Sequence, residues 1–116
     1  MSSEETIFDK IVRGEIPSDK VYEDDQVLAF RDINPAAPVH ILVIPKRGFV
    51  NLFGATEAHE QVLGRMMRLA GQIAREQGLE EGGFRLVANN GAGAGQSVFH
   101  LHLHILGGRA FSWPPG

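Results

Sequence analysis

Hydrophobic and polar residues alternate strictly near the end of the chain, from residue 99 to residue 105. Histidines occupy every second position there and are separated by leucine or isoleucine: His100, Leu101, His102, Leu103, His104 and Ile105. A period of two is typical of a β-strand, because alternate side chains of a strand share one face. The pattern therefore predicts a strand with one aliphatic face and one face that presents three neighbouring imidazoles.

Two other segments have the period of an amphipathic helix. Residues 5–13 carry a short apolar stripe after Thr6, and residues 56–77 carry a longer stripe after Thr56. Threonine is a favourable N-cap residue, so both segments are predicted to be helices. The longer stripe consists of residues at helical spacing: Val62, Met66, Leu69 and Ile73.

Apolar runs bounded by turn residues predict four further strands. They lie at residues 20–23, 26–31, 39–45 and 84–88. Asp24 and Asp25 would form a tight hairpin turn between the first two. The order of elements predicts one α+β domain over residues 1–116, with about five mostly antiparallel strands, one long helix and one short helix.

Composition is that of an ordinary globular protein, with 43% hydrophobic and 22% charged residues. The net charge of −3 argues against a protein that coats nucleic acid. The chain has no cysteine, which excludes disulfides and thiolate metal sites. The first five residues are acidic, unlike a secretory signal, and no apolar run reaches membrane-spanning length. We therefore expect a cytoplasmic protein without membrane contact.

The alternating histidines are compatible with three kinds of chemistry. Together with His40 they could form a metal site, because imidazoles two residues apart on a strand can share a zinc ion. They could form a structural or pH-sensing cluster. One imidazole could instead be the nucleophile of a covalent mechanism at phosphorus. A hydrophobic core has no use for three desolvated imidazoles in a row, so the pattern favours a functional role.

A glycine-rich loop directly precedes these histidines. Gly91, Gly93 and Gly95 allow the backbone to approach a ligand closely, and Gln96 and Ser97 add side-chain donors. The loop is neither a P-loop, since no Lys-Ser or Lys-Thr pair follows, nor a dinucleotide fingerprint, since it joins two predicted strands. Its position predicts that it holds an anion against the imidazoles.

Asp32, at the end of a predicted strand, has two interpretations. Its carboxylate could cap the following turn, or it could accept hydrogen bonds from two ribose hydroxyls. In the second case, apolar residues would form a slot for the base: Phe8, Ile11, Phe30 and Ile33.

The order of these motifs resembles the histidine triad superfamily over almost the whole chain. Residues 100–106 fit its His-φ-His-φ-His-φ-φ pattern, in which φ is apolar. The other matching segments are residues 7–17, 29–35, 38–46 and 95–98. The end of the chain, at residues 107–109 and 113–116, is similar to the branch of histidine triad nucleotide-binding proteins that hydrolyse purine nucleoside phosphoramidates.

The resemblance implies a role for each histidine of the site. His102 would attack the α-phosphorus and carry the nucleotidyl group, while His104 would contact the phosphate and assist protonation. His100 would support the geometry of the strand, and His40 would lie close to the same site. No metal or other cofactor would be required.

The resemblance also implies the residues that hold a purine nucleotide. Asp32 would bind the ribose hydroxyls, with Ile33 and Phe30 beside the base. Phosphate would be bound by residues of the glycine loop and its flanks: Asn89, Gly95, Gln96 and Ser97. Ser97 would also lie near the leaving group.

Members of this family are typically homodimers in which the long helix and a strand meet at the two-fold axis, and the apolar stripe on residues 62–73 agrees with such a contact. The tail, residues 107–116 with Trp113, would then reach toward the partner's site. Three features depart from the family pattern, one of which is that the loop at residues 90–94 lacks the acidic residue common there. Gly48 stands where many members have histidine, and Asp9 stands where some relatives carry a cysteine of a structural zinc site.

The resemblance therefore predicts a hydrolase that releases AMP or GMP from purine nucleoside 5′-phosphoramidates through a nucleotidyl-histidine intermediate. Two alternatives remain open. One is a nucleotide-binding adaptor with vestigial catalysis. The other is a dinucleoside polyphosphate hydrolase or nucleotidyltransferase of a sister branch.

Overall fold

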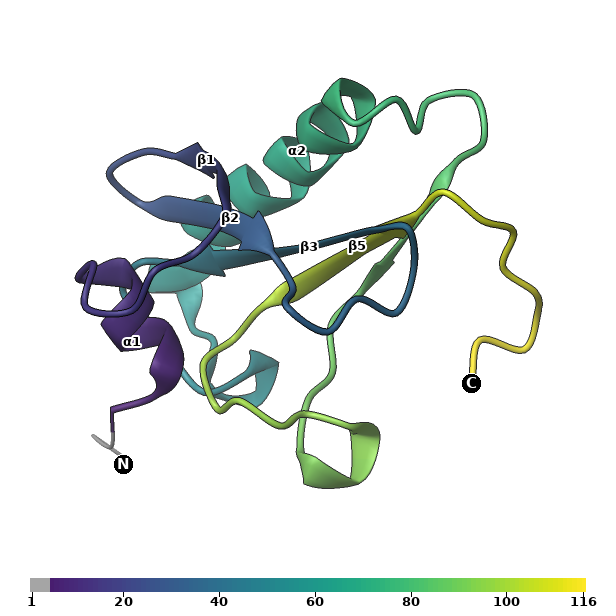
Figure 1. Ribbon diagram of the computed structural model, residues 1–116. Coiled ribbons are helices and arrows are strands. Elements are labelled where there is room, and N and C mark those ends of the chain that lie inside the picture. The colour runs from purple at the N-terminus through teal and green to yellow at the C-terminus, as the bar shows by residue number, and fades with distance from the viewer. Residues whose placement is uncertain (1–4) are drawn as a thin grey trace.

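The computed structural model describes residues 5–116, which form a five-stranded antiparallel sheet with two α-helices (Figure 1). The elements are α1 (Ile7–Val12), β1 (Lys20–Glu23), β2 (Val27–Arg31), β3 (Val39–Pro45), α2 (Glu60–Glu76), β4 (Phe84–Val87) and β5 (Leu103–Gly107). The strands lie side by side in the order β1-β2-β3-β5-β4. This arrangement confirms the predicted α+β fold.

Residues 1–4, which make up most of the acidic segment that we distinguished from a secretory signal, lie outside the described part of the chain. Among residues 5–116, no helix is both long and apolar enough to cross a membrane.

The sheet separates two hydrophobic layers, because side chains alternate between its faces. The face toward α2 carries alternate residues of the central strands: Val27, Ala29, Ile41 and Val43. The face toward α1 carries the residues between them: Leu28, Phe30, Leu42 and Ile44. Figure 1 shows α2 lying along one side of the sheet and the short α1 at one end of the other side. The rest of the α1 face is therefore available to hold a site.

The short helix begins where the sequence predicts. Thr6 accepts hydrogen bonds from the backbone N–H groups of Phe8 and Asp9, and the Asp9 carboxylate accepts one from the backbone N–H of Thr6. This reciprocal capping box satisfies N–H groups that have no partner within the helix. It also fixes the position of Asp9 relative to the start of α1.

The long helix differs from its prediction in two respects. Thr56 caps a 3₁₀ turn, Glu57–His59, so α2 itself begins only at Glu60. The apolar stripe also lies against the sheet, with Met66, Leu69 and Ile73 almost fully buried. The stripe therefore belongs to the core of this chain. It is not free for the subunit contact that we had expected it to make.

The histidine strand also begins later than predicted. β5 starts at Leu103, opposite Val43 of β3, and the residues before it leave the sheet. Two residues beyond Val43 along β3, Pro45 has no N–H to donate to the ladder. The N–H of Leu101 instead donates to the carbonyl of Phe49 at 2.7 Å. His100 and His102 therefore lie in an irregular segment before the strand, and only His104 lies within it.

Candidate active site

A cavity of about 310 Å³ lies beside α1 on the face of the sheet opposite α2. This volume is at the lower end of the range for small-molecule sites. The cavity brings together many of the predicted site residues: Phe8, Ile11, Phe30, Asp32, Ile33, Ser97, His102 and His104. Other predicted residues lie outside its lining: His40, His100, Asn89, Gly95, Gln96 and Trp113.

His102 presents a free ring nitrogen in this cavity. Its Nδ1 lies 2.7 Å from the backbone carbonyl oxygen of His100. Because a carbonyl can only accept, Nδ1 carries the proton and Nε2 keeps its lone pair. Burial lowers the pKa of His102, which holds the ring in its neutral form. A neutral imidazole oriented in this way can act as a nucleophile.

His40 and His104 form a directed pair of imidazoles. The backbone N–H of Ala36 donates to His40 Nδ1 at 3.0 Å, so the His40 proton is on Nε2. That Nε2 lies 2.9 Å from Nδ1 of His104 and donates to it. The proton of neutral His104 is consequently on its own Nε2.

The Nε2–H of His104 is buried and has no hydrogen-bond partner among residues 5–116. Burial first, and then the neighbouring His102 and His40, lower the pKa of His104 to about 4. A buried donor without an acceptor costs about 1–3 kcal/mol, which a bound ligand atom could recover. The pair therefore ends in a proton donor beside His102, whose ring centre is 4.8 Å from that of His104.

His100 lies outside the lining of this cavity, although its ring and that of His102 both pack against Phe8, with centres 5.7 and 5.1 Å from that of Phe8. Its ring is only 2% exposed, and its Nε2–H donates to the carbonyl of Pro45 at 2.8 Å. A Cβ atom on Gly48 would lie 2.4 Å from the ring, so the ring can occupy this position only beside a glycine. His100 supports the site through its backbone carbonyl, which orients His102.

Both interpretations of Asp32 agree with its position. One carboxylate oxygen accepts from the backbone N–H of Asn34 at 2.8 Å, as in a turn cap. The other lies 3.4 Å from Nε2 of His40, and the residue lines the cavity. Phe8 and Phe30 form an almost fully buried wall, whereas Ile33 is 90% exposed at the rim. The apolar slot predicted next to Asp32 therefore exists.

The glycine loop is held in place by Gln96. Its side-chain oxygen accepts from Asn51 and from the backbone N–H of Gly91, and its amide group donates to the carbonyls of Val50 and Val98. These four bonds use the full capacity of the amide. In this conformation, Gln96 shapes the loop and offers no free donor to a phosphate.

The other loop residues differ in their relation to the cavity. Ser97 is exposed and lines it, so its hydroxyl is accessible to a ligand. Gly95 adopts a left-handed backbone conformation, with φ +98°, directly above the side chain of Asn89. Neither Gly95, which belongs to the loop, nor Asn89, which precedes it, lines the cavity.

Trp113 is 80% exposed and lies away from the cavity of its own chain. The tail around it is held by Arg85, which donates to the carbonyl of Ser112 and lies over the ring of Phe111. Figure 1 shows the tail on the opposite side of the molecule from α1. A contact of Trp113 with a partner's site remains a prediction.

Asp32, His40 and His104 place potential metal-ligating atoms within 4.8 Å of one another. The surroundings of His40 oppose a metal. A ligating imidazole normally donates its second N–H to an acceptor, whereas Nδ1 of His40 faces the N–H of Ala36. Binding a metal at Nε2 would place two donors against each other. The described residues suit a hydrogen-bonded pair better than a metal centre.

Two contributors to the site have no signal in the sequence. Ala36 acts through its backbone N–H, which every residue except proline possesses. Ser18 lines the apolar part of the cavity, and its buried hydroxyl has no partner among the described residues. Neither residue belongs to a recognisable motif.

Comparison with known proteins agrees with this geometry. The HIT domain family model matches residues 13–111. The chain is 55% identical over 113 residues to the 14 kDa zinc-binding protein of Zea mays, covering 96% of this chain and 88% of the relative. It is 53% identical over 107 residues to the purine nucleoside phosphoramidase of Escherichia coli, covering 92% and 90%.

Solved structures give the same result. A HIT family hydrolase from Legionella pneumophila superimposes with a TM-score of 0.94 at 46% identity, covering 97% of this chain and 100% of the other. A match of this extent shows that the two proteins share the fold and the family. The chain therefore belongs to the HIT family of hydrolases, in its histidine triad nucleotide-binding branch.

Proposed function

We propose that the protein hydrolyses the P–N bond of purine nucleoside 5′-phosphoramidates and releases AMP or GMP. The observation that carries this proposal is the free Nε2 lone pair of His102 in a cavity that also contains Asp32 and an apolar slot. The activity named for the Escherichia coli relative supports it.

In the first step, Nε2 of His102 attacks the α-phosphorus and forms a P–N bond, while the bond from phosphorus to the leaving amine breaks. The amine takes the proton from Nε2 of His104, and His104 recovers a proton at Nδ1 from Nε2 of His40. A solvent proton replaces it at Nε2 of His40, which then donates to the Asp32 carboxylate 3.4 Å away, so both rings stay neutral. The carbonyl of His100 stabilises the positive charge on the modified His102 ring. Protonation of the amine is essential, because an amide anion is a very poor leaving group.

In the second step, water attacks the nucleotidyl group, and the bond between phosphorus and His102 breaks. The lone pair that the first step left on Nε2 of His104 accepts the water proton. His104 then releases its Nδ1 proton to solvent, and Nε2 of His40 again donates to that nitrogen, which restores the starting tautomers. The same pair thus acts as acid in one step and as base in the next.

The remaining residues bind the nucleotide in this proposal. Asp32 accepts the ribose hydroxyls, and the base lies in the apolar slot: Phe8, Ile11, Phe30 and Ile33. Ser97, Gly95 and Asn89 contact phosphate, whereas Gln96 keeps their loop in shape. No residue of this set needs a metal ion, although the Zea mays relative is named for zinc.

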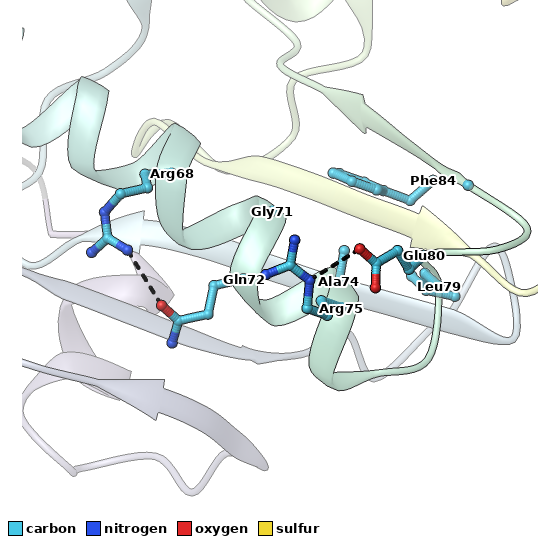
Figure 2. Close-up of a pocket in the computed structure, with 9 residues that line it drawn as sticks. Arg68, Gly71, Gln72, Ala74, Arg75, Leu79, Glu80 and Phe84 are labelled. Carbon is cyan, nitrogen blue, oxygen red and sulfur yellow. Dashed lines mark hydrogen bonds and ion pairs between the residues drawn. The ribbon is translucent and has the colours of Figure 1, made fainter.

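We also propose a homodimer, with contacts other than the buried stripe of α2. β4 is an edge strand, and Met67 and Phe84 are 57% and 38% exposed. A hollow of about 650 Å³ lies between α2 and this edge. Figure 2 shows Arg68 and Arg75 on α2, and Leu79 and Phe84 beyond the end of the helix. A second copy would cover it and bring each Trp113 toward the partner's cavity. Phe84→Glu should weaken dimers measured by light scattering.

The test is AMP release from adenosine 5′-phosphoramidate by chelator-treated protein, with His102→Ala in parallel. Release by the wild type alone supports the proposal. Release by both proteins contradicts the role of His102, and loss of release after chelation would indicate a metal. Binding of AMP without turnover would favour the adaptor, and cleavage of dinucleoside polyphosphates alone would favour the sister branch.

A further inference from the structure

Two buried side-chain atoms lack a hydrogen-bond partner within residues 5–116: Nε2 of His104 and Oγ of Ser18. Both residues line the nucleotide cavity. The proposed mechanism gives the His104 proton to the leaving amine, but it makes no use of the Ser18 hydroxyl. Buried polar groups are nearly always hydrogen-bonded, and an unpaired one destabilises the folded chain. A ligand in this cavity would supply the partner that Ser18 lacks.

Ser18 lies beside the apolar slot, level with Asp32. The backbone N–H of Arg31 donates to the carbonyl of Asp19 at 3.0 Å, which extends the pairing of β1 with β2 by one residue. The same register, continued by one more residue, brings Ser18 next to Asp32. Phe30 and Asp32 share one face of the sheet because they are two residues apart. The cavity lining contains Ser18 together with both of them, which agrees with this placement.

The base is the part of the nucleotide that still needs a polar partner. In the proposed binding mode the phosphorus lies at His102, and the ribose hydroxyls bind Asp32. The apolar side chains of the slot can cover the faces of a base, but they cannot pair with the nitrogen and oxygen atoms on its edge. Arg31 also lines the cavity, but its guanidinium donates to Gln77 at 3.1 Å. The Ser18 hydroxyl is thus an unused hydrogen-bonding group beside the slot.

We propose that the Ser18 hydroxyl forms a hydrogen bond with the edge of the purine base and is a specificity-determining group of the slot. A hydroxyl donates one hydrogen bond, accepts others and turns to suit its partner. It can donate to a ring nitrogen or to the oxygen of guanine, and it can accept from the amino group of adenine. One residue therefore serves both purines, whereas a base of the same shape without polar edge atoms would leave the hydroxyl unpaired. This inference rests on the proposed function and adds a base-recognition residue to it.

The test measures binding of four nucleoside 5′-monophosphates by isothermal titration calorimetry: AMP, GMP, 2′-deoxy-AMP and the ribonucleotide of indole. Indole has a shape similar to that of a purine but no polar atom on its free edge, so its nucleotide is the matched control. Ser18→Ala should weaken binding of AMP, GMP and 2′-deoxy-AMP by the same factor of about 10 and should leave binding of the indole nucleotide unchanged. Ser18→Cys should behave in the same way, because a thiol is a weak donor, and it serves as the second variant if Ser18→Ala fails to fold.

A purely structural role of Ser18 would give a different result. Removal of an unpaired hydroxyl should leave the Tm of the ligand-free protein unchanged or raise it, whereas loss of a structural hydrogen bond would lower it. Equal weakening of all four nucleotides, or unchanged binding of AMP in both variants, would overturn the inference. A loss for AMP that is absent for 2′-deoxy-AMP would place the hydroxyl at the ribose and would also overturn it.

Hydrolysis of adenosine 5′-phosphoramidate by the wild type separates this inference from the proposed function. If the wild type hydrolyses that substrate but Ser18 has no effect on base binding, only the role of Ser18 is wrong. If the wild type neither hydrolyses it nor binds any of the four nucleotides, both the proposed function and the role of Ser18 are wrong.

Discussion

Nε2 of His40 donates a hydrogen bond to Nδ1 of His104 at 2.9 Å, although 64 residues separate the two histidines. The sheet makes this contact, because β3 and β5 are antiparallel neighbours in which Leu42 is paired with His104. His40 is therefore the diagonal neighbour of His104 on the same face. The backbone N–H of Ala36 thus fixes the tautomer of His40, and His40 fixes that of His104. The Nε2–H of His104 is therefore a proton donor beside His102.

Replacing His104 should affect amine leaving groups most. His104→Ala removes the group that protonates the departing amine, so adenosine 5′-phosphoramidate hydrolysis should slow by about 10²–10⁴-fold. The 4-nitrophenyl ester of AMP needs no such proton, because nitrophenolate is a stable anion, and its first step should slow far less. Steady-state and pre-steady-state rates on both substrates check this. An equal loss on both would assign His104 to binding.

Gly48→Ala should disturb the active site through His100, which lies next to Gly48. Its Cβ would lie 2.4 Å from the ring of His100, so the ring and the carbonyl that orients His102 must shift. We expect a loss of about 1–3 kcal/mol in the free energy of unfolding, together with a lower kcat. Urea unfolding and steady-state kinetics measure both.

Gly64→Ala is the control for that substitution. Gly64 lies exposed within α2, and an added Cβ would contact nothing within 4 Å. This variant should gain about 0.5–1 kcal/mol, since alanine favours a helix over glycine, and should keep its activity. A harmless Gly48→Ala would contradict the packing of His100.

Stability should fall as the pH decreases below neutral. Burial lowers the pKa values of His100, His102 and His104 from 6.5, that of His104 to about 4. Between these values the unfolded chain binds more protons than the folded chain, so the free energy of unfolding decreases as pH falls from about 6.5 toward 4. Urea titrations at several pH values measure it. His104→Gln should flatten the dependence, and a stability that rises on acidification would contradict the buried neutral rings.

Much of the fold could be read from the sequence, because burial of one face of a helix or strand imposes a period on its hydrophobic residues. Asp24 forms the predicted hairpin turn by accepting from the N–H groups of Gln26 and Val27. The start of β5 could not be read in the same way. Alternation continues through His100 and His102, but the partner strand ends at Pro45, and that restriction depends on register.

The site could be predicted in part for a related reason. Asp32 and the apolar residues of the slot are recognisable by residue type, and the cavity contains them. Tautomers depend on hydrogen-bond partners, and those of His40 and His102 are backbone groups of residues 36 and 100. No residue type encodes such a partner. The role of Trp113 would depend on a second chain, which one sequence cannot specify.

The central claim is that His102 carries the nucleotidyl group, and the stereochemical course at phosphorus tests it most directly. A chiral adenosine 5′-phosphorothioate amide, hydrolysed in ¹⁸O-labelled water, distinguishes two in-line displacements from one. Attack by His102 followed by attack by water inverts phosphorus twice, so we expect overall retention, and no product from His102→Ala. Inversion would mean that water attacks the substrate directly, and would contradict the covalent mechanism.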